Sequence, residues 1–297
     1  MVNNRKIDLF IIGTQKAGTS SLREYLIQHP ELISHNTNEL PFLTFDNEFH
    51  KGFEAIWSTY FSLNVSGSSR FVIAKNVLAM YSETALRRLY DHNPEVQIVI
   101  FLRNPVNRAY SAYWYARRRE EQNISDPETA IKSSINSQDL SSLKKFNVAY
   151  LEVGKYVSYL QKVYEIFPAN QINIFTVEDF KNDTQGVCNK LFNKIGLTPV
   201  DIEKDRQVNS AAKPRFPALA KILYSTFSGS KFLAQILPLK FRVWMRRSKI
   251  KLARWNDVPF EYPKIDEDLR QWLIEFYLPY NKELGLFLER DLSLWNR

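Results

Sequence analysis

The chain has 297 residues, of which 44% are hydrophobic and 24% are charged. These proportions are typical of a soluble globular protein and exclude wholesale disorder, a collagen-like chain and a long coiled coil. No apolar run approaches the roughly 18 residues that a membrane-spanning helix needs. The single cysteine, Cys188, excludes an intrachain disulfide and a cysteine-built metal site. The first residues lack the apolar core of a signal peptide, so we expect a cytoplasmic protein.

The net charge of +8 comes from one segment of the chain. Between Arg206 and Asn256 there are 12 Lys and Arg residues and no Asp or Glu, whereas the rest of the chain is net negative. Such a block binds polyanions or an anionic membrane surface, or it is a solvated helical face. We expect one domain over residues 1–297, in which residues 206–262 form a basic helical lid or insertion. Peripheral contact of residues 206–256 with the inner membrane face is one expected role.

Apolar runs and helical spacings alternate along the rest of the chain. Short apolar runs predict strands at Ile7–Ile12, Leu32–Ser34, Phe71–Ala74, Val96–Leu102 and Gln171–Phe175. Helical spacing of apolar residues predicts helices that contain Leu22–His29, Leu86–Tyr90, Val106–Tyr113, Tyr156–Phe167, Val187–Ile195 and Leu269–Tyr277. Ser82 suits the N-cap of the second helix, and Pro105 suits the first position of the third. We therefore expect an α/β fold of the P-loop-like, three-layer kind, with a central, mostly parallel sheet and helices on both faces.

The strongest local signal is the loop Gly13–Ser21, which follows the first strand and opens a helix. Two of the nine glycines of the chain stand in it, five residues apart. A strand, loop and helix of this kind present backbone N–H groups and a helix N-terminus to an anion. Lys16 adds a positive charge, and Thr19, Ser20 and Ser21 add hydroxyl donors.

This loop differs from the Walker A motif, Gly-x-x-x-x-Gly-Lys-Ser/Thr, at one important position. Thr19 stands where the motif has its lysine, and the lysine of this chain lies inside the loop, at Lys16. We therefore expect the loop to hold a phosphate-like group without the geometry of a magnesium-bound nucleotide. The alternative is an ordinary turn between strand and helix that carries a surface lysine.

A second anion site is predicted after the strand Val96–Leu102. Arg103 follows this strand directly, at the carboxyl end, where open α/β sheets bind their ligands. Ser111 follows eight residues later, on the helix that starts at Pro105. An arginine can grip a phosphate with two hydrogen bonds, and a serine on a helix can add a donor. Arg108, between them, suits packing or a salt bridge better than ligand binding.

Two neighbouring anion sites suit a nucleotide with phosphates at both ends of its ribose. With both loops present, the chain resembles the sulfotransferase family, whose cosubstrate is 3′-phosphoadenosine 5′-phosphosulfate (PAPS). The resemblance implies Arg103 and Ser111 for the 3′-phosphate. It implies that the 5′-phosphosulfate is bound by backbone and side-chain groups of Lys16, Ala17, Gly18, Thr19 and Ser20.

The stretch Asn38–Leu43 resembles the Lys-Glu-x-x-Phe-Phe motif of heparan-sulfate-type carbohydrate sulfotransferases and their bacterial relatives. The resemblance implies that Glu39 is the general base that accepts the proton of the acceptor. The stretch Ala74–Asn76 resembles the Glu-Lys-Thr of the same enzymes, although only the lysine matches, and it implies contact of Lys75 with the sulfuryl group or the acceptor. His35 is the reserve candidate for the base, and a surface loop carboxylate is the alternative for Glu39.

The C-terminal part departs from the family pattern. Many relatives have a Lys-Gly-Arg loop that folds over the cofactor just before the last helices. The comparable stretch here, Asn256–Tyr262, contains none of these residue types. Either closure over the cofactor is looser, or Lys251 or Arg254 supplies the charge.

We therefore expect a PAPS-dependent sulfotransferase that sulfates a hydroxyl or amine, on a carbohydrate or otherwise on a lipid-linked sugar or small metabolite. Lys16 would neutralise charge on the leaving nucleotide, Glu39 would deprotonate the acceptor, and Lys75 would assist them. No metal and no nucleic acid partner are expected. The alternatives are a P-loop-type small-molecule kinase and a non-catalytic module that binds polyanions or a membrane surface. The absence of the Walker A lysine, whose position Thr19 takes, argues against the kinase. A non-catalytic binding module would not need two anion-binding loops.

Overall fold

The computed structural model describes residues 5–61, 71–203, 212–224 and 255–297, together with positions 245, 248–249 and 251–253. Their contacts divide the chain into two compact units. The first comprises Met1–Ala109, Glu152–Asn209 and Glu267–Arg297, and the second comprises Tyr110–Leu151 and Ser210–Asp266. The predicted insertion, residues 206–262, falls almost wholly in the second unit. That the whole chain is one domain remains a prediction.

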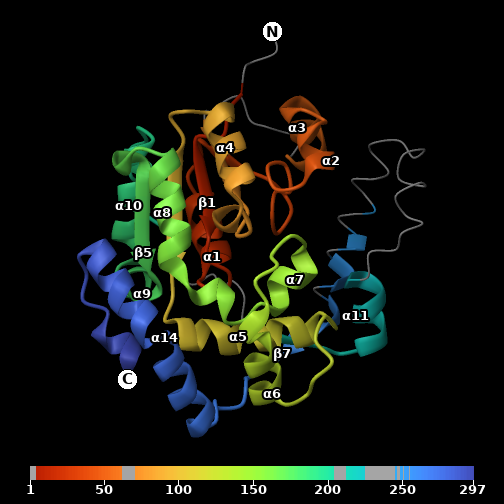
Figure 1. Cartoon of the computed structure of the whole chain (residues 1–297). Coiled ribbons are helices and arrows are strands. Elements are labelled where there is room, and N and C mark those ends of the chain that lie inside the picture. Colours follow the sequence, from red (N-terminus) through yellow and green to blue (C-terminus); the bar gives the residue numbers. More distant parts are fainter. Residues whose placement is uncertain are drawn as a thin grey trace. The chain divides into compact units, whose positions relative to one another are not determined.

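The first unit is built on a five-stranded parallel sheet, as expected (Figure 1). Its strand order is β2-β3-β1-β4-β5, with β1 in the centre. Each strand lies within two residues of its predicted position. The bounds are Leu9–Gly13 for β1, Leu32–Ser34 for β2, Phe71–Lys75 for β3, Gln97–Leu102 for β4 and Ile172–Thr176 for β5.

Alternating side chains of the strands pack into two separate cores, one on each face of the sheet. Phe10 and Ile98 point into one core, whereas Leu9 and Val99 point into the other. Because both faces are covered, the central strands are almost uniformly apolar. The three-layer prediction is therefore confirmed for the first unit.

Helices of the first unit cover both faces of this sheet (Figure 1). Helices α4 (Glu83–His92) and α8 (Tyr156–Ile166) line one face, with α3 (Phe53–Tyr60) and the C-terminal end of α14 (Glu267–Leu288) at the same core. Helices α1 (Thr19–Leu26), α9 (Val177–Asn182) and α10 (Thr184–Lys194) line the other face. The short helix α2 (Asp46–Phe49) precedes α3.

Two predicted helix starts are confirmed by their capping contacts. The hydroxyl of Ser82 accepts a hydrogen bond from the backbone N–H of Ala85 at 3.2 Å, at the start of α4. Helix α5 (Pro105–Arg118) begins at Pro105, and the side-chain oxygen of Asn104 accepts from the N–H of Val106 at 2.9 Å. Both caps satisfy helix N–H groups that have no acceptor within the helix.

The second unit contains most of α5, then α6 (Pro127–Lys132), α7 (Leu143–Val148) and α11 (Pro217–Tyr224). It also holds an antiparallel strand pair, β6 (Ala212–Pro214) and β7 (Asp257–Pro259). Helix α11 agrees with the helical prediction for the basic segment. Most of residues 225–254 lie outside the described residues, so the predicted lid stays a prediction.

Candidate functional site

The predicted anion loop lies where β1 ends and α1 begins. Lys16 and Gly18 both have left-handed backbone conformations, with φ of 67° and 86°, which turn the chain sharply into the helix. Gly18 is the N-cap of α1, provides no side-chain cap, and is followed by no acidic residue in the first turn. The positive end of the helix dipole is therefore not offset by an acidic residue of its own first turn, which favours an anionic ligand.

The two glycines of this loop are needed for different reasons. At Gly18 the positive φ is costly for any residue with a side chain, whereas the space around it is open. At Gly13 a Cβ atom would lie only 2.6 Å from the sulfur of Met80. Gly13 thus allows close packing behind the loop, and Gly18 shapes the backbone of the predicted anion loop.

Arg103, predicted to hold the second phosphate, also anchors the first loop. Its Nη1 donates to the carbonyl oxygen of Lys16 at 2.8 Å. The hydroxyl of Tyr156, a buried residue at the start of α8, donates to the carbonyl oxygen of Arg103 at 2.8 Å. The two predicted anion loops are therefore joined at the carboxyl ends of β1 and β4, with the half-buried Arg103 between them.

Apart from the exposed Gly18, the remaining predicted cofactor residues are partly or fully buried. Ala17 and Thr19 are buried, while Lys16 and Ser20 are half-buried. Ser111 is buried in the part of α5 that belongs to the second unit, and its role at the 3′-phosphate stays a prediction.

Arg108 is completely buried, as expected for a packing role, and it is hydrogen-bonded to the hydroxyl of Tyr277. The same guanidinium lies close enough to Tyr81 and Tyr156 to favour their ionised forms, although burial raises the pKa of both phenols. Packing or a salt bridge was predicted for this arginine, and its complete burial agrees with packing.

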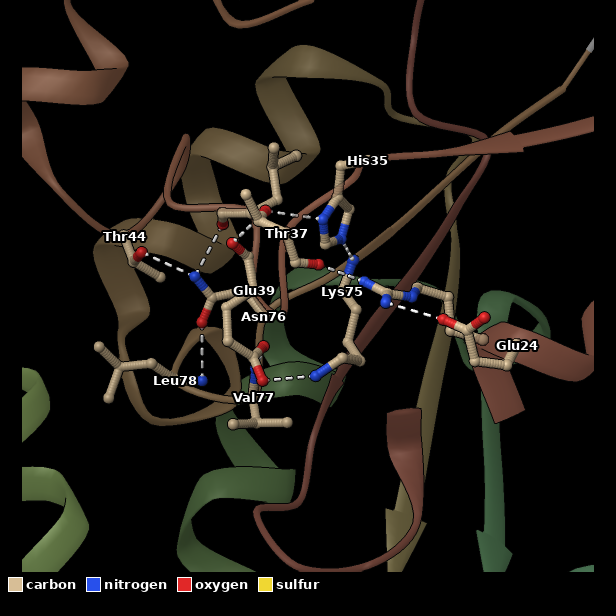
Figure 2. Close-up of polar contacts among 11 residues, drawn as sticks. Glu24, His35, Thr37, Glu39, Thr44, Lys75, Asn76, Val77 and Leu78 are labelled. Carbon is tan, nitrogen blue, oxygen red and sulfur yellow. Dashed lines mark hydrogen bonds and ion pairs between the residues drawn. The ribbon is translucent and has the colours of Figure 1, made fainter. Parts of the chain in front are cut away.

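Glu39 and Lys75, predicted from separate motifs, form an ion pair (Figure 2). The Lys75 ammonium contacts one oxygen of the Glu39 carboxylate, and the backbone N–H of Val77 donates to the other at 3.0 Å. Lys75 is only 1% exposed, whereas 32% of the Glu39 side chain reaches solvent. The carboxylate therefore faces the exterior with a fixed orientation, and the ammonium lies behind it.

Burial lowers the pKa of Lys75, because a charged amine loses its hydration inside the protein. The neighbouring Glu39 carboxylate and its hydrogen bond oppose this shift. Contact of Lys75 with the sulfuryl group or the acceptor stays a prediction. Its burial and its pairing favour a role in positioning Glu39.

Asn76, which was not predicted as a functional residue, holds the Glu39 loop against β3. The amide of Asn76 donates to the Leu40 carbonyl at 2.8 Å and to the Thr44 hydroxyl at 3.0 Å, and its oxygen accepts from the N–H of Leu78 at 2.9 Å (Figure 2). Asn76 is 3% exposed. A polar residue directly after a buried strand is the signal that could have found it.

His35, the reserve candidate, is not available as a base. Its Nε2 accepts a hydrogen bond from the backbone N–H of Lys75 at 3.1 Å, in a buried position. Burial and the charges of Arg23 and Lys75 hold its pKa well below the usual 6.5. A nitrogen that is already occupied by a backbone donor cannot take the proton of an acceptor.

The stretch in place of the Lys-Gly-Arg loop includes a strand. Asp257–Pro259 is β7, and the Asp257 carboxylate pairs with Arg118 of the same unit. Lys251, one of the two proposed substitutes for the missing charge, is exposed, and Arg254 lies outside the described residues. The stretch that lacks Gly, Lys and Arg therefore contains a regular strand.

Neither a metal-binding cluster nor a membrane-spanning helix is found in the part of the chain that the structure describes. Within the described ranges, His, Cys, Asp and Glu nowhere gather in a group of three or more that could hold a metal ion. No described helix is long and apolar enough to cross a membrane. The expectation that no metal is needed stays a prediction.

Comparison with known proteins identifies related sequences and folds. The family model described as "Sulfotransferase domain" matches residues 6–221. Human "Bifunctional heparan sulfate N-deacetylase/N-sulfotransferase 3" is 23% identical over 97% of this chain and 31% of its own length. For the human protein numbered 1 in this series the identity is 26%, over 97% of this chain and 30% of that protein. The chain thus spans about a third of the length of these relatives.

Among solved structures, "Crystal Structure of Sulfotransferase from Alicyclobacillus acidocaldarius" matches with a TM-score of 0.66 and 21% identity. The match covers 99% of this chain and 100% of the other. The predicted α/β fold and the predicted family are confirmed. The alternatives of a small-molecule kinase and a non-catalytic module receive no support from these matches.

Proposed function

The chain belongs to the sulfotransferase family, and we propose that it moves a sulfuryl group from PAPS to a hydroxyl or amine of a carbohydrate. The acceptor class comes from the names of the relatives, which include N-sulfotransferases of heparan sulfate. An amine or hydroxyl of such a polysaccharide is a nucleophile that a carboxylate can deprotonate.

The residues at the ends of β1 and β4 suit a doubly phosphorylated nucleotide. The helix N-terminus at Gly18 lacks a side-chain cap, and Lys16 and Arg103 are joined beside it by a hydrogen bond. We assign the 5′-phosphosulfate to the loop from Lys16 to Ser20 and the 3′-phosphate to Arg103 and Ser111. When bound, the donor supplies an activated sulfuryl group whose bond to the 5′-phosphate oxygen breaks during transfer.

Three side chains then have distinct chemical roles. Glu39 accepts the proton from the acceptor as the new sulfur–oxygen or sulfur–nitrogen bond forms. Lys75 and the Val77 N–H hold the two carboxylate oxygens of Glu39, each of which can still accept another hydrogen bond. Lys16 neutralises the negative charge on the departing phosphate. Because this charge develops as the bond to sulfur breaks, Lys16 stabilises the transition state more than the bound substrate.

One observation supports this proposal most: the Glu39–Lys75 ion pair and the two predicted anion loops lie at the carboxyl ends of three neighbouring strands. β3 ends at Lys75, β1 leads into the loop of Lys16, and β4 leads into Arg103. In the order β3-β1-β4, these ends meet at one edge of the sheet. Ligands of open parallel sheets bind at this edge.

The test is a transfer assay with labelled PAPS and a panel of acceptors: N-desulfated heparan sulfate, a neutral polysaccharide and a small phenol. We expect label in the heparan-type polysaccharide and none in the phenol. Transfer to the phenol alone would contradict the carbohydrate acceptor. Transfer of phosphate from ATP, with none of sulfate from PAPS, would contradict the donor.

A further inference from the structure

The strand β2 is unusually short beside its partner. It pairs with β3 in parallel from Leu32 to Ser34, and the pairing stops at Ile73, although β3 continues to Lys75. The N–H of Phe71 donates to the carbonyl of Glu31 at 3.1 Å. Since a parallel ladder repeats every two residues, the N–H of Ile73 would be followed by that of Lys75, which would meet the backbone carbonyl of residue 35.

The ring of His35 takes the place of that carbonyl. Its Nε2 lies 3.1 Å from the Lys75 nitrogen, and the backbone is thereby free to turn away from the sheet (Figure 2). The chain returns to Lys75 five residues later, where the N–H of Leu40 donates to the Lys75 carbonyl at 2.8 Å. The loop that carries Glu39 is therefore attached to both backbone groups of the residue whose ammonium Glu39 binds.

The hydrogen bonds determine the protonation of the ring. Because a backbone N–H can only donate, Nε2 carries no proton, and the neutral ring is protonated at Nδ1. Nδ1 lies 3.0 Å from the hydroxyl of Thr37, and this hydroxyl donates to the carbonyl of Glu39 at 2.9 Å. The result is a continuous relay of hydrogen bonds from the Lys75 backbone, through His35 and Thr37, to the Glu39 backbone.

The charged groups around the ring keep it neutral. Arg23 donates to the Thr37 carbonyl at 2.6 Å and pairs with Glu24 at 2.9 Å, and Lys75 pairs with Glu39. The positive charges of Arg23 and Lys75 add to burial in lowering the pKa of His35. An imidazolium would also present a donor to the Lys75 N–H.

We propose that His35 is a positioning residue for Glu39: its neutral imidazole replaces the missing strand backbone and sets the Glu39 carboxylate against Lys75. This inference rests on the proposed sulfuryl transfer, in which Glu39 takes the proton. His35 touches neither reactant and acts only through the loop.

The test compares three variants of the relay with a matched control. His35→Phe keeps a ring in this buried place and removes both nitrogens, whereas His35→Gln restores an acceptor that can reach the Lys75 N–H. Thr37→Val breaks the second link from a half-buried position. The control is His29→Phe. His29 precedes β2, whereas His35 follows it, and both histidines are 3% exposed. The Nε2 of His29 lies 3.0 Å from the Thr198 carbonyl oxygen.

A misplaced catalytic group commonly costs up to about a hundredfold in rate. We expect His35→Phe to lower kcat by about tenfold to a hundredfold, with the Kd of adenosine 3′,5′-bisphosphate within about twofold of the parent. His35→Gln should recover most of the rate, and Thr37→Val should lower kcat by about threefold to tenfold. His29→Phe should lose stability and keep kcat.

The opposite results would overturn the proposal. An unchanged kcat in Thr37→Val, or equal losses of kcat in His35→Phe and His29→Phe, would mean that the ring serves stability alone. If His35→Phe does not fold, Thr37→Val and His35→Gln decide: the first must be slower than the parent, and the second must be nearly as fast.

A spectroscopic measurement separates this inference from the proposed function. Long-range ¹H–¹⁵N spectra of the parent should show His35 protonated only at Nδ1, and unchanged from pH 7.5 to pH 5.5. This readout needs no acceptor, so a parent that transfers no sulfate contradicts the proposed function and leaves the relay testable. A ring protonated at Nε2, or one that titrates near its ordinary pKa, would overturn the relay itself.

Discussion

Glu39→Gln is the substitution whose effect on stability follows most directly from the structure. Glutamine keeps the shape of the side chain and removes the charge opposite Lys75, which is 1% exposed. Removing one partner of a buried ion pair commonly costs about 3–5 kcal/mol. Because about a third of Glu39 reaches solvent, we expect a smaller loss in the free energy of unfolding at pH 7, about 2–3 kcal/mol.

The loss should depend on pH with a definite sign. Burial already lowers the pKa of Lys75 from 10.5, and the Glu39 charge opposes this shift, so Glu39→Gln lowers the pKa further. A lysine whose pKa is lower in the folded than in the unfolded protein makes its full contribution to stability at a pH above its unfolded-state pKa. The protein loses this contribution as the pH falls towards the folded-state pKa. The difference between parent and variant is therefore largest at neutral pH and shrinks as the pH approaches 10.5.

Urea unfolding followed by tryptophan fluorescence at pH 7 and pH 10 measures this difference. The control is the double variant Glu39→Gln, Lys75→Met, in which an apolar side chain replaces the stranded ammonium. Such replacements are often neutral or stabilising, so the double variant should regain most of the lost stability. A Glu39→Gln variant as stable as the parent at both pH values would refute the buried pair.

Three further predictions concern the anion loops and one buried histidine. Lys16→Ala should lower kcat far more than it raises the KM for PAPS, because charge on the leaving group develops in the transition state; unchanged turnover would rule out a catalytic role. Arg103→Ala should weaken binding of adenosine 3′,5′-bisphosphate by about 1.5–3 kcal/mol in calorimetry and that of AMP by clearly less; equal losses would mean that the arginine serves only the loop of Lys16. The Nε2 of His92 accepts from the N–H of Ile7 at 3.1 Å, and burial lowers its pKa to about 4. The free energy of unfolding of the parent should therefore fall by about 2–3 kcal/mol between pH 6.5 and pH 4, and His92→Gln should reduce this fall; parallel pH profiles of stability for the two proteins would contradict the prediction.

The sheet was predictable because its strands are buried on both faces. Uniformly apolar runs such as Val96–Leu102 leave little choice of structure, and β4 differs from that run by a single residue. The short helices between residues 46 and 60 were not predicted. They cover only four and eight residues, and helices this short are stabilised by tertiary packing more than by their local sequence.

Candidate residues of the site could be named from the sequence, but their contacts could not, and their roles stay predictions. Lys16 and Arg103 could be chosen because each follows a recognisable strand, whereas Glu39 and Lys75 were chosen from short motifs that resemble those of a known family. Their pairing depends on the strand order, which places β3 next to β1, and on the turn of the chain after Ser34. Hydrogen bonds between backbone and side chain over 40 residues leave no local pattern in the sequence.

The most direct test of the central claim is sulfuryl transfer from labelled PAPS to N-desulfated heparan sulfate by the parent and by Glu39→Gln. Binding of adenosine 3′,5′-bisphosphate is measured on the same preparations. We predict transfer by the parent and at least a hundredfold slower transfer by Glu39→Gln, with the nucleotide Kd of the two within about twofold, since a general base contributes about 10²–10⁴ to the rate. A Glu39→Gln variant that binds the nucleotide and transfers sulfate as fast as the parent would contradict the account.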